Sequence, residues 1–218
     1  MDAIQKRRAE EKEQRREAII DAAEQVFADT GFDRATIDEV ARQARVSRAL
    51  VYLYFKNRDE LQLAVGVRAL RLLREHFLAA VAAEDSGYDK VAACGHTYLR
   101  FAAEHPTYFA ALSHFESRPA TEALTPTESE MFAAGRAVHE VMIAALETGI
   151  ADGSLRSDID DLWLTSLSLW AFTHGLIQLG RTKARFMSEL DVATDTFFDY
   201  AIDMAMRGLQ PPKPAPGA

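Results

Sequence analysis

Residues Thr36–Arg58 read TIDEVARQARVSRALVYLYFKNR, and this stretch decides the fold of the N-terminal part of the chain. Thr36 and Glu39 have the spacing of a capping box, in which two side chains satisfy the first backbone amides of a helix, so a short helix is predicted over residues 36–44. Ser47 is a favoured N-cap residue and predicts a second helix directly after it. A tight turn over residues 44–46 joins the two predicted helices, and the stretch therefore predicts a helix-turn-helix.

The second helix of this motif carries apolar and aromatic side chains on more than one side. At about 100° per residue, Val51 and Phe55 fall on one face and can pack against the first helix of the motif and the helix before it. The opposite face and its flanks then carry Ala49, Leu50, Tyr52, Leu53 and Tyr54. DNA is a suitable partner for such a face, because leucines can contact thymine methyl groups and tyrosine hydroxyls can donate to phosphates. The alternative is a small helical core with incidental surface aromatics.

Charge is distributed unevenly along the chain, which has a net charge of −8. Residues 1–66 hold 12 basic and 13 acidic residues, whereas residues 67–218 hold 13 and 20. No acidic residue lies between Arg42 and Arg58, so this segment predicts a basic patch that can face phosphates. Arg48 can reach a guanine edge or a phosphate, and backbone amides at the two helix starts can bind phosphates. The residues predicted to contact DNA are Thr36, Ser47, Arg48, Ala49, Leu50, Tyr52, Leu53, Tyr54, Lys56 and Arg58.

Helical signals recur along the rest of the chain, and no segment shows the sustained alternation of a β-strand. Gly31, as a C-terminal cap, predicts that a first helix ends near Thr30, and Asn57 with Glu60 has the cap spacing that begins a fourth helix. Further helices are expected over residues 88–104, 106–117, 126–152, 160–182 and 188–208. The predicted fold class is all-α, with an N-terminal three-helix helix-turn-helix domain, a larger C-terminal helical bundle, and about nine helices in total.

The last two predicted helices are more apolar than the surface of a monomer tolerates. Apolar residues from Leu162 to Leu179 cover nearly the whole circumference of one helix, and the other has an apolar seam from Leu190 to Gly208. Two such helices from each of two chains would form a four-helix dimer interface. The alternative is that both helices lie in the core of a monomer. The residues predicted for the dimer interface are Trp163, Leu167, Phe172, Leu176, Phe197, Ala201 and Met204.

Aromatic residues with a few polar groups gather in the sequence between the fourth and the eighth predicted helices. They are Phe101, Tyr108, Phe109, His114, Phe115, Met131, Phe132, His139, Trp170 and His174. Pockets for small apolar molecules have such linings, and so do ordinary helical cores. Because Glu104, Glu116 and Glu140 are nearby in sequence and arginines are few, the composition favours a hydrophobic effector that is neutral or cationic. A filled core beneath an exposed apolar patch would instead favour a DNA-bound scaffold for another protein.

Catalytic and metal sites find no support in the sequence. Cys94 and His96 are two residues apart, so on a helix they point about 200° away from each other and cannot form a nucleophile–base pair locally. His139 and Glu140 lack the second histidine of a zinc motif, since Ile143 stands at that position. We therefore expect no enzyme activity, no cofactor and no metal. A single cysteine and the lack of a signal peptide or membrane span predict a cytoplasmic protein.

Three segments are expected from these features. Residues 1–66 form the helix-turn-helix domain with a charged N-terminal extension, residues 67–209 the effector-binding and dimerisation domain, and residues 210–218 a disordered proline-rich tail. The extension interleaves basic and acidic residues between Lys6 and Arg16, which is typical of a solvated helix face. The alternative is that it reaches the adjacent minor groove, as basic arms can.

Residues Thr36–Leu61 closely resemble the DNA-binding domain of the TetR (tetracycline repressor) family. The residues in register are Val46, Ser47, Val51, Tyr52, Tyr54, Phe55, Lys56, Asn57 and Leu61. The preceding helix and its Gly31-Phe32 ending are similar too, so the resemblance covers residues 15–65; the rest of the chain is similar in length, helix count and its two C-terminal helices. Leu50 and Leu53 depart from the family pattern, in which smaller or more polar residues are commoner, and they indicate a distinct operator.

The resemblance implies a mechanism as well as a fold. A homodimer places two recognition helices in successive major grooves of a palindromic double-stranded operator, and an effector in the larger domain tilts the fourth helix and changes their separation. DNA is then released. Such a protein is expected on the bacterial nucleoid, most often as a repressor; activation is the alternative, because the sign depends on where the operator lies relative to a promoter.

Overall fold

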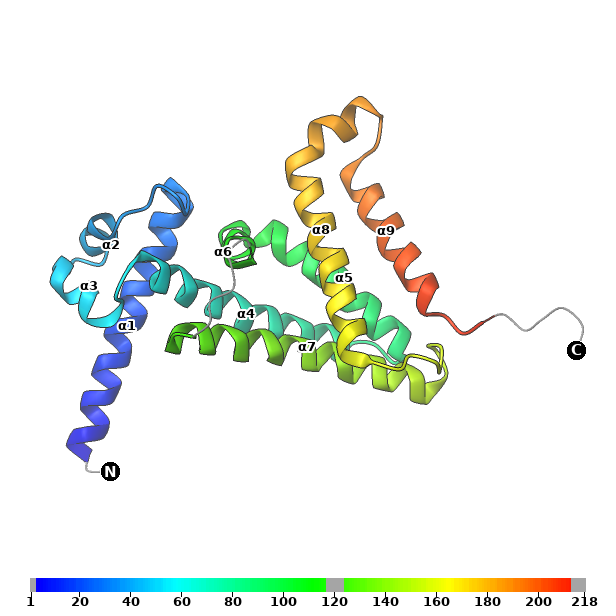
Figure 1. Cartoon of the computed structure of the whole chain (residues 1–218), viewed down its shortest axis with the longest axis horizontal. Coiled ribbons are helices and arrows are strands. Elements are labelled where there is room, and N and C mark those ends of the chain that lie inside the picture. Colours follow the sequence, from blue (N-terminus) through cyan, green and yellow to red (C-terminus); the bar gives the residue numbers. More distant parts are fainter. Residues whose placement is uncertain (1–2, 117–123, 213–218) are drawn as a thin grey trace, which may run out of the picture. The chain divides into compact units, whose positions relative to one another are not determined.

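The computed structural model describes residues 3–116 and 124–212, and helices make up most of this part of the chain (Figure 1). The described part contains nine helices and no strand, which confirms the all-α fold class. The helices are α1 (Ala3–Thr30), α2 (Ile37–Gln43), α3 (Arg48–Tyr54), α4 (Arg58–Ala82), α5 (Gly87–Glu104), α6 (Pro106–Glu116), α7 (Pro126–Asp152), α8 (Leu162–Glu189) and α9 (Thr194–Leu209). None of the described helices is both long and apolar enough to span a membrane.

The chain divides into two compact units. The first unit comprises Met1–Leu70 and His105–Ala134, and the second comprises Arg71–Glu104 and Gly135–Ala218. Helices α1, α2, α3 and α6 belong to the first unit, α5, α8 and α9 belong to the second, and α4 and α7 contribute to both. Helix α6, which lies within the predicted domain of residues 67–209, is part of the first unit, and its apolar side packs against the core around α1.

The core of the first unit forms where α2 and α3 pack against the second half of α1. Its buried members include Ile19, Ile20, Phe27, Val40, Val51, Phe55 and Leu61. Gly31 ends α1 with a φ of 80°, the left-handed conformation of a C-cap glycine, and its amide donates to the carbonyl of Phe27 at 2.9 Å. The predicted end of the first helix is therefore confirmed.

The second unit is built around α5, which packs against both α8 and α9, and these two helices also pack on each other. The start of α5 lies so close to α7 that a Cβ atom at Gly87 would stand 1.9 Å from the backbone nitrogen of Gly149. The amide of Gly87 donates to Asp152 Oδ2 at 2.8 Å, and the amide of Tyr88 donates to Ser154 Oγ at 2.9 Å. Two otherwise unpaired amides of the helix start are thereby satisfied.

Proline and capping signals located helix starts well. Pro106 and Pro126 occupy first helical positions, as predicted. Thr125 and Glu128 form the predicted capping box, with the Thr125 amide 2.7 Å from Glu128 Oε2 and the Glu128 amide 3.2 Å from Thr125 Oγ1. Gly153 follows α7 with a φ of 76°, which confirms it as the residue that ends this helix.

The boundary between α8 and α9 was predicted wrongly. We expected α8 to end at residue 182, but it continues to Glu189, because residues 183–189 include no glycine or proline and favour a helix. The chain then turns at Asp191, which has a φ of 54°, and α9 begins at Thr194 instead of residue 188. Leu190 therefore lies in the connection and not in the apolar seam of α9. Of the predicted tail, residues 213–218 lie outside the described residues.

Candidate DNA-binding surface and ligand cavity

The capping box fixes the start of α2. Thr36 Oγ1 accepts from the amide of Glu39 at 3.3 Å, and Glu39 Oε2 accepts from the Thr36 amide at 2.9 Å and from its hydroxyl at 2.8 Å. These hydrogen bonds hold the pKa of the Glu39 carboxyl below its usual value. The Thr36 amide that we predicted for phosphate binding is therefore already used within the protein.

The turn between the two helices sets the orientation of α3. Arg45 adopts a φ of 55°, and the amide of Val46 donates to the carbonyl of Ala41 at 2.9 Å. Ser47 Oγ then accepts from the amide of Leu50 at 3.2 Å and caps α3, as predicted. The turn needs a left-handed residue, and Arg45 takes this conformation without a glycine.

Helix α3 presents the face that the sequence predicted. Val51 and Phe55 are buried in the core of the first unit, which confirms their inward orientation. On the outward side Ala49 is exposed, Tyr52 is 41% exposed and Leu53 is 72% exposed. Two large side chains on a surface helix of so small a unit form an apolar, aromatic surface that can meet another molecule.

Arg48 at the start of α3 has two partners inside the protein. Its guanidinium lies 3.2 Å from Asp38 Oδ2 on α2, donates to the Tyr52 hydroxyl at 3.2 Å, and stacks 5.4 Å from the centre of the Tyr52 ring. The hydrogen bond to Tyr52 and the charge of Asp38 raise the pKa of Arg48. The basic patch read from the sequence therefore includes a carboxylate, because the fold brings Asp38 beside it.

The other residues predicted to contact DNA differ in the exposure and in the hydrogen-bond partners of their side chains. Arg58 donates to the backbone carbonyls of Asp33 at 2.7 Å and Ala35 at 3.5 Å, so its charge anchors the connection before α2. Tyr54 is half-buried and packs against the core, whereas the side chain of Lys56 is exposed. Leu50 is half-exposed on the flank of α3.

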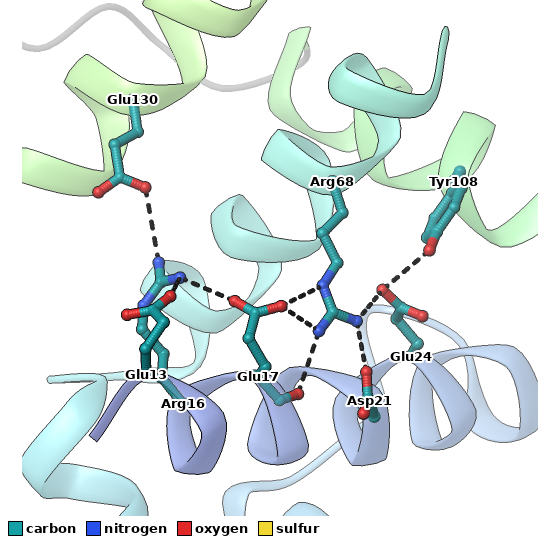
Figure 2. A network of polar contacts seen from close by, with 8 residues as sticks. All are labelled: Glu13, Arg16, Glu17, Asp21, Glu24, Arg68, Tyr108 and Glu130. Carbon is teal, nitrogen blue, oxygen red and sulfur yellow. Dashed lines mark hydrogen bonds and ion pairs between the residues drawn. The ribbon is translucent and has the colours of Figure 1, made fainter. Parts of the chain in front are cut away.

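A polar network ties α4 to α1 and α6 in the first unit (Figure 2). Arg68 on α4 lies 2.5 Å from Glu17, 2.7 Å from Asp21 and 2.9 Å from Glu24, all on α1. Glu24 also accepts a hydrogen bond from the Tyr108 hydroxyl on α6 at 3.0 Å. Burial, followed by the neighbouring charge of Glu24, raises the pKa of Tyr108 to about 12. Arg68 thus joins α4 to α1, and Glu24 links α1 to α6. The partners of Arg68 lie 44 to 51 positions away in the chain, so no helical spacing predicts these contacts.

The second unit contains a cavity of about 30 Å³ lined by α4, α5, α7 and α8. Its lining is mostly apolar, with Leu73 and Phe77 contributed by α4. Two hydrogen-bonded pairs include polar groups of the lining. His139 Nδ1 lies 2.8 Å from Ser166 Oγ, and the Tyr98 hydroxyl lies 2.8 Å from His174 Nδ1. Burial lowers the pKa of His139, which keeps its imidazole neutral near pH 7.

Comparison with known sequences decides the family. Residues 19–65 match the profile of the bacterial regulatory proteins of the tetR family. Residues 91–205, more than half of the chain, match the tetracyclin repressor-like C-terminal domain. The chain belongs to the tetR family. It is therefore a member of a family of transcriptional regulators and not of an enzyme family.

Curated relatives of this tetR-family regulator match over short stretches. The transcriptional regulator BetI of Rhizobium meliloti is 38% identical over 79 residues, which are 36% of this chain and 39% of the relative. The fatty acid metabolism regulator protein of Bacillus subtilis is 38% identical over 47 residues, 22% of this chain and 24% of the relative. The chain thus spans about two fifths or less of the length of these relatives.

Solved structures match over nearly the whole regulator. A protein of unknown function from Rhodococcus sp. RHA1 has a TM-score of 0.71 at 23% identity, covering 90% of this chain and 95% of that one. The regulator FadR of Bacillus subtilis in complex with stearoyl-CoA has a TM-score of 0.69 at 16% identity, covering 88% of this chain and 98% of that one. At these identities the likeness establishes the fold.

The ten residues predicted for the effector pocket fall in both units of the chain. Phe101, His139, Trp170 and His174 belong to the second unit, where His139 and Trp170 line the cavity and His174 bonds to Tyr98, a residue of the lining. The other six belong to the first unit: Tyr108, Phe109, His114, Phe115, Met131 and Phe132. There Phe109 is buried, the His114 ring stacks on Phe32, and Phe115 meets Phe132 edge to face.

The residues predicted for the dimer interface differ in exposure. Trp163, Leu167 and Met204 are exposed on α8 and α9, and Phe172 and Phe197 are half-buried. Leu176 and Ala201 are buried within the second unit, because they face the packing between α5, α8 and α9. Further large apolar side chains are exposed on the same two helices: Leu164, Leu179, Phe186 and Tyr200.

Proposed function

We propose that this regulator binds a palindromic operator as a homodimer in the bacterial cytoplasm, represses transcription there, and is released by a small, largely hydrophobic effector. The exposed face of α3 carries the proposal. Leu53 and Tyr52 stand outward on a helix whose other face is fixed in the core by Val51 and Phe55. A rigid helix with an apolar outward face fits the major groove, where thymine methyl groups are available.

Each exposed group of α3 has a role in this proposal. Ala49 and Leu53 meet base edges, and the small side chain of Ala49 permits close approach. Tyr52 and Lys56 meet phosphates. Arg48 reaches a guanine or a phosphate by exchanging its partner Asp38 for DNA, so Asp38 weakens non-specific binding.

Support for the dimer comes from the exposed apolar surface of α8 and α9. Leu164 is 63% exposed, Leu167 is 42% exposed and Met204 is 52% exposed. Apolar surface on two adjacent helices is stabilised by a second copy that contributes the same helices. The two copies then present two α3 helices to two half-sites.

Support for an effector comes from the cavity in the second unit. The cavity holds polar groups within an apolar lining, which is typical of a ligand sensor and disfavours a scaffold with a filled core. FadR, with the same fold, was solved with stearoyl-CoA, a ligand that is largely apolar. The effector proposed here is likewise largely hydrophobic, and Leu73 and Phe77 bring it against α4.

The experiment is a selection of bound sequences from a random duplex library, followed by titrations of the enriched duplex. Wild type, Leu53→Ala, Arg48→Ala and the control Arg185→Ala are compared at several salt concentrations. Arg185 matches Arg48 in charge and has one surface ion pair, to Glu189 on the same helix. We expect a palindrome whose affinity falls steeply with salt, a loss of about 1–3 kcal/mol for Arg48→Ala, and no loss for Arg185→Ala.

Other outcomes refute parts of the proposal. Equal binding by wild type and both α3 variants would refute α3 as the reading helix. Enrichment of a single half-site by a protein that sediments as a monomer would refute the dimer. Operator binding that no small molecule relieves, together with stable capture of a protein partner, would support the scaffold alternative.

A further inference from the structure

The cavity of the second unit has hydrogen-bonding capacity that the protein does not use. Nδ1 of His139 is engaged by Ser166. Among the described residues, neither Nε2 of His139 nor the indole N–H of Trp170 has a hydrogen-bond partner. Both side chains line the cavity. A molecule in the cavity therefore contacts two side chains that each have an atom able to form a further hydrogen bond.

Charge is missing from the cavity lining. The lining residues include no Asp, Glu, Lys or Arg, and the polar ones are neutral side chains such as Ser166 and Thr173. An ion in this cavity would lose its water without gaining a counter-charge, which is costly in an apolar environment. The lining therefore selects against carboxylates and ammonium groups and favours an uncharged molecule.

Flat rings form much of the cavity wall. Phe77, Tyr98, His139 and Trp170 all line it, and the Trp170 ring meets the His139 ring edge-on, with centroids 6.1 Å apart and an interplanar angle of 77°. Aromatic rings prefer edge-to-face and offset contacts with other rings. A planar aromatic guest gains such contacts on several sides, and a flexible or puckered aliphatic guest does not.

The space available indicates the size of the guest. A second cavity of about 20 Å³ shares Gly95, Met142, Leu169 and Thr173 with the first. A single aromatic ring needs a cavity on the order of 150 Å³, so side chains must move for it to bind. Met142 is unbranched and adaptable, and its displacement would join the two spaces. With Met142 displaced, the joined space suits a molecule with no more than one ring.

We propose that the joined cavity binds an uncharged aromatic compound of one ring that carries one hydrogen-bonding group, recognised by His139 and Trp170. This inference rests on the proposed function, because it names the chemical class of the effector at the same site.

Tryptophan fluorescence offers a direct test, because the chain has two tryptophans and both lie beside His139. The centroids of the Trp163 and Trp170 rings are each 6.1 Å from that of His139. The full-length protein is titrated with five probes of similar size: p-cresol, toluene, p-toluate, 4-methylbenzylammonium and 4-methylcyclohexanol. We expect p-cresol to change the emission and to bind about tenfold more tightly than toluene, since it adds one hydrogen bond. The two ions and the aliphatic alcohol should bind more weakly than toluene.

Two variants test the assignment of the residues. His139→Leu should abolish the roughly tenfold preference for p-cresol over toluene, because leucine removes the hydrogen-bonding group of His139 but keeps an apolar side chain at that position. The control His96→Leu changes an exposed histidine on α5 and should leave the preference unchanged. If His139→Leu fails to fold, Leu169→Phe provides the second test, because it fills both cavities and should weaken all probes together.

The same titrations in the presence of the selected operator separate this inference from the proposed function. Tight binding of p-toluate or 4-methylbenzylammonium, or no binding of any aromatic probe, would overturn the inference while operator binding stands. Binding of p-cresol by a protein that recognises no operator would sustain the inference about the cavity and refute the proposed function. Binding of p-cresol that also releases the operator would support both.

Discussion

Replacing Arg68 by methionine should lower the free energy of unfolding by about 2–3 kcal/mol, because the substitution leaves three carboxylates of α1 without their shared cation. Arg68 donates to Glu17 Oε2 from Nε at 3.0 Å and from Nη2 at 2.5 Å, and its Nη1 contacts Asp21 and Glu24 (Figure 2). Methionine keeps most of the apolar stem of arginine, so the loss reports the charge and its hydrogen bonds.

Exposure of the partners sets this magnitude. The Arg68 side chain is 19% exposed and Glu24 is 23% exposed, so this pair lies in a partly desolvated environment. Asp21 is 66% exposed, and its pair with Arg68 is screened by water and contributes little. Breaking a fully buried pair costs about 3–5 kcal/mol, and the partial exposure here reduces the expected loss.

Urea unfolding of wild type and variants at one protein concentration measures the loss, since a dimer would make stability depend on concentration. Arg71→Met is the matched control: Arg71 is exposed on the same helix and has no ion pair or hydrogen bond within the described ranges, so a change within about 0.5 kcal/mol is expected. Glu24→Gln completes a double-mutant cycle with Arg68→Met, and the coupling energy should shrink at high salt. Equal losses for Arg68→Met and Arg71→Met would refute the reasoning.

Four further predictions follow from individual side chains. Burial lowers the pKa of His139 below its usual 6.5, so as the pH falls the unfolded chain takes up a proton on this residue before the folded chain does. The contribution of His139 to the free energy of unfolding should therefore be fully present above pH 6.5 and decrease below it. His139→Gln should remove this part of the pH profile of urea unfolding. Burial raises the pKa of the Cys94 thiol to about 12, so a disulfide reagent at pH 8 should modify the native protein more than about 100-fold more slowly than the protein in urea. Ser47→Ala should cost about 1 kcal/mol of stability by removing the cap of α3, whereas Ser47→Asp should keep the stability and weaken operator binding, because a carboxylate would then face phosphates; equal operator affinity for the two variants would contradict this. Gly87→Ala should cost about 3 kcal/mol or more, since its Cβ would stand 1.9 Å from a backbone nitrogen, whereas Gly208→Ala, with no atom within 4 Å, should be neutral or slightly stabilising in the same urea assay.

Local signals in the sequence predicted local structure well. The caps at Thr36 and Ser47 and the inward face of Val51 depend on residues three or four positions apart, and the spacing itself carries that information. The partner of Arg48 could not be predicted in this way. Asp38 lies ten positions away on another helix, and the pair forms because the turn at Arg45 brings the starts of α2 and α3 together.

The lining of the cavity was harder to predict for the same reason. Composition identified aromatic residues along four helices but could not assign them to one unit or the other. Phe115 and Phe132 serve the first unit, whereas His139 and Trp170 line the cavity of the second. Tyr98 also lines the cavity but was not among the residues predicted for the pocket. Its hydrogen bond to His174 joins residues 76 positions apart in the chain, so no helical spacing predicts it.

Helix α4 contains residues of both the polar network and the cavity, and this bears on the proposed release of DNA by an effector. Arg68 holds the helix against α1, and Leu73, five residues further along, lines the cavity. A change from 99% DNA-bound to 1% requires about 5.5 kcal/mol of differential effector affinity between the two conformations. If α4 moves relative to α1, part of that free energy is needed to break the contacts of Arg68 with α1. Arg68→Met should therefore lower the effector concentration needed for release, whereas unchanged sensitivity would mean that α1 and α4 move as one body.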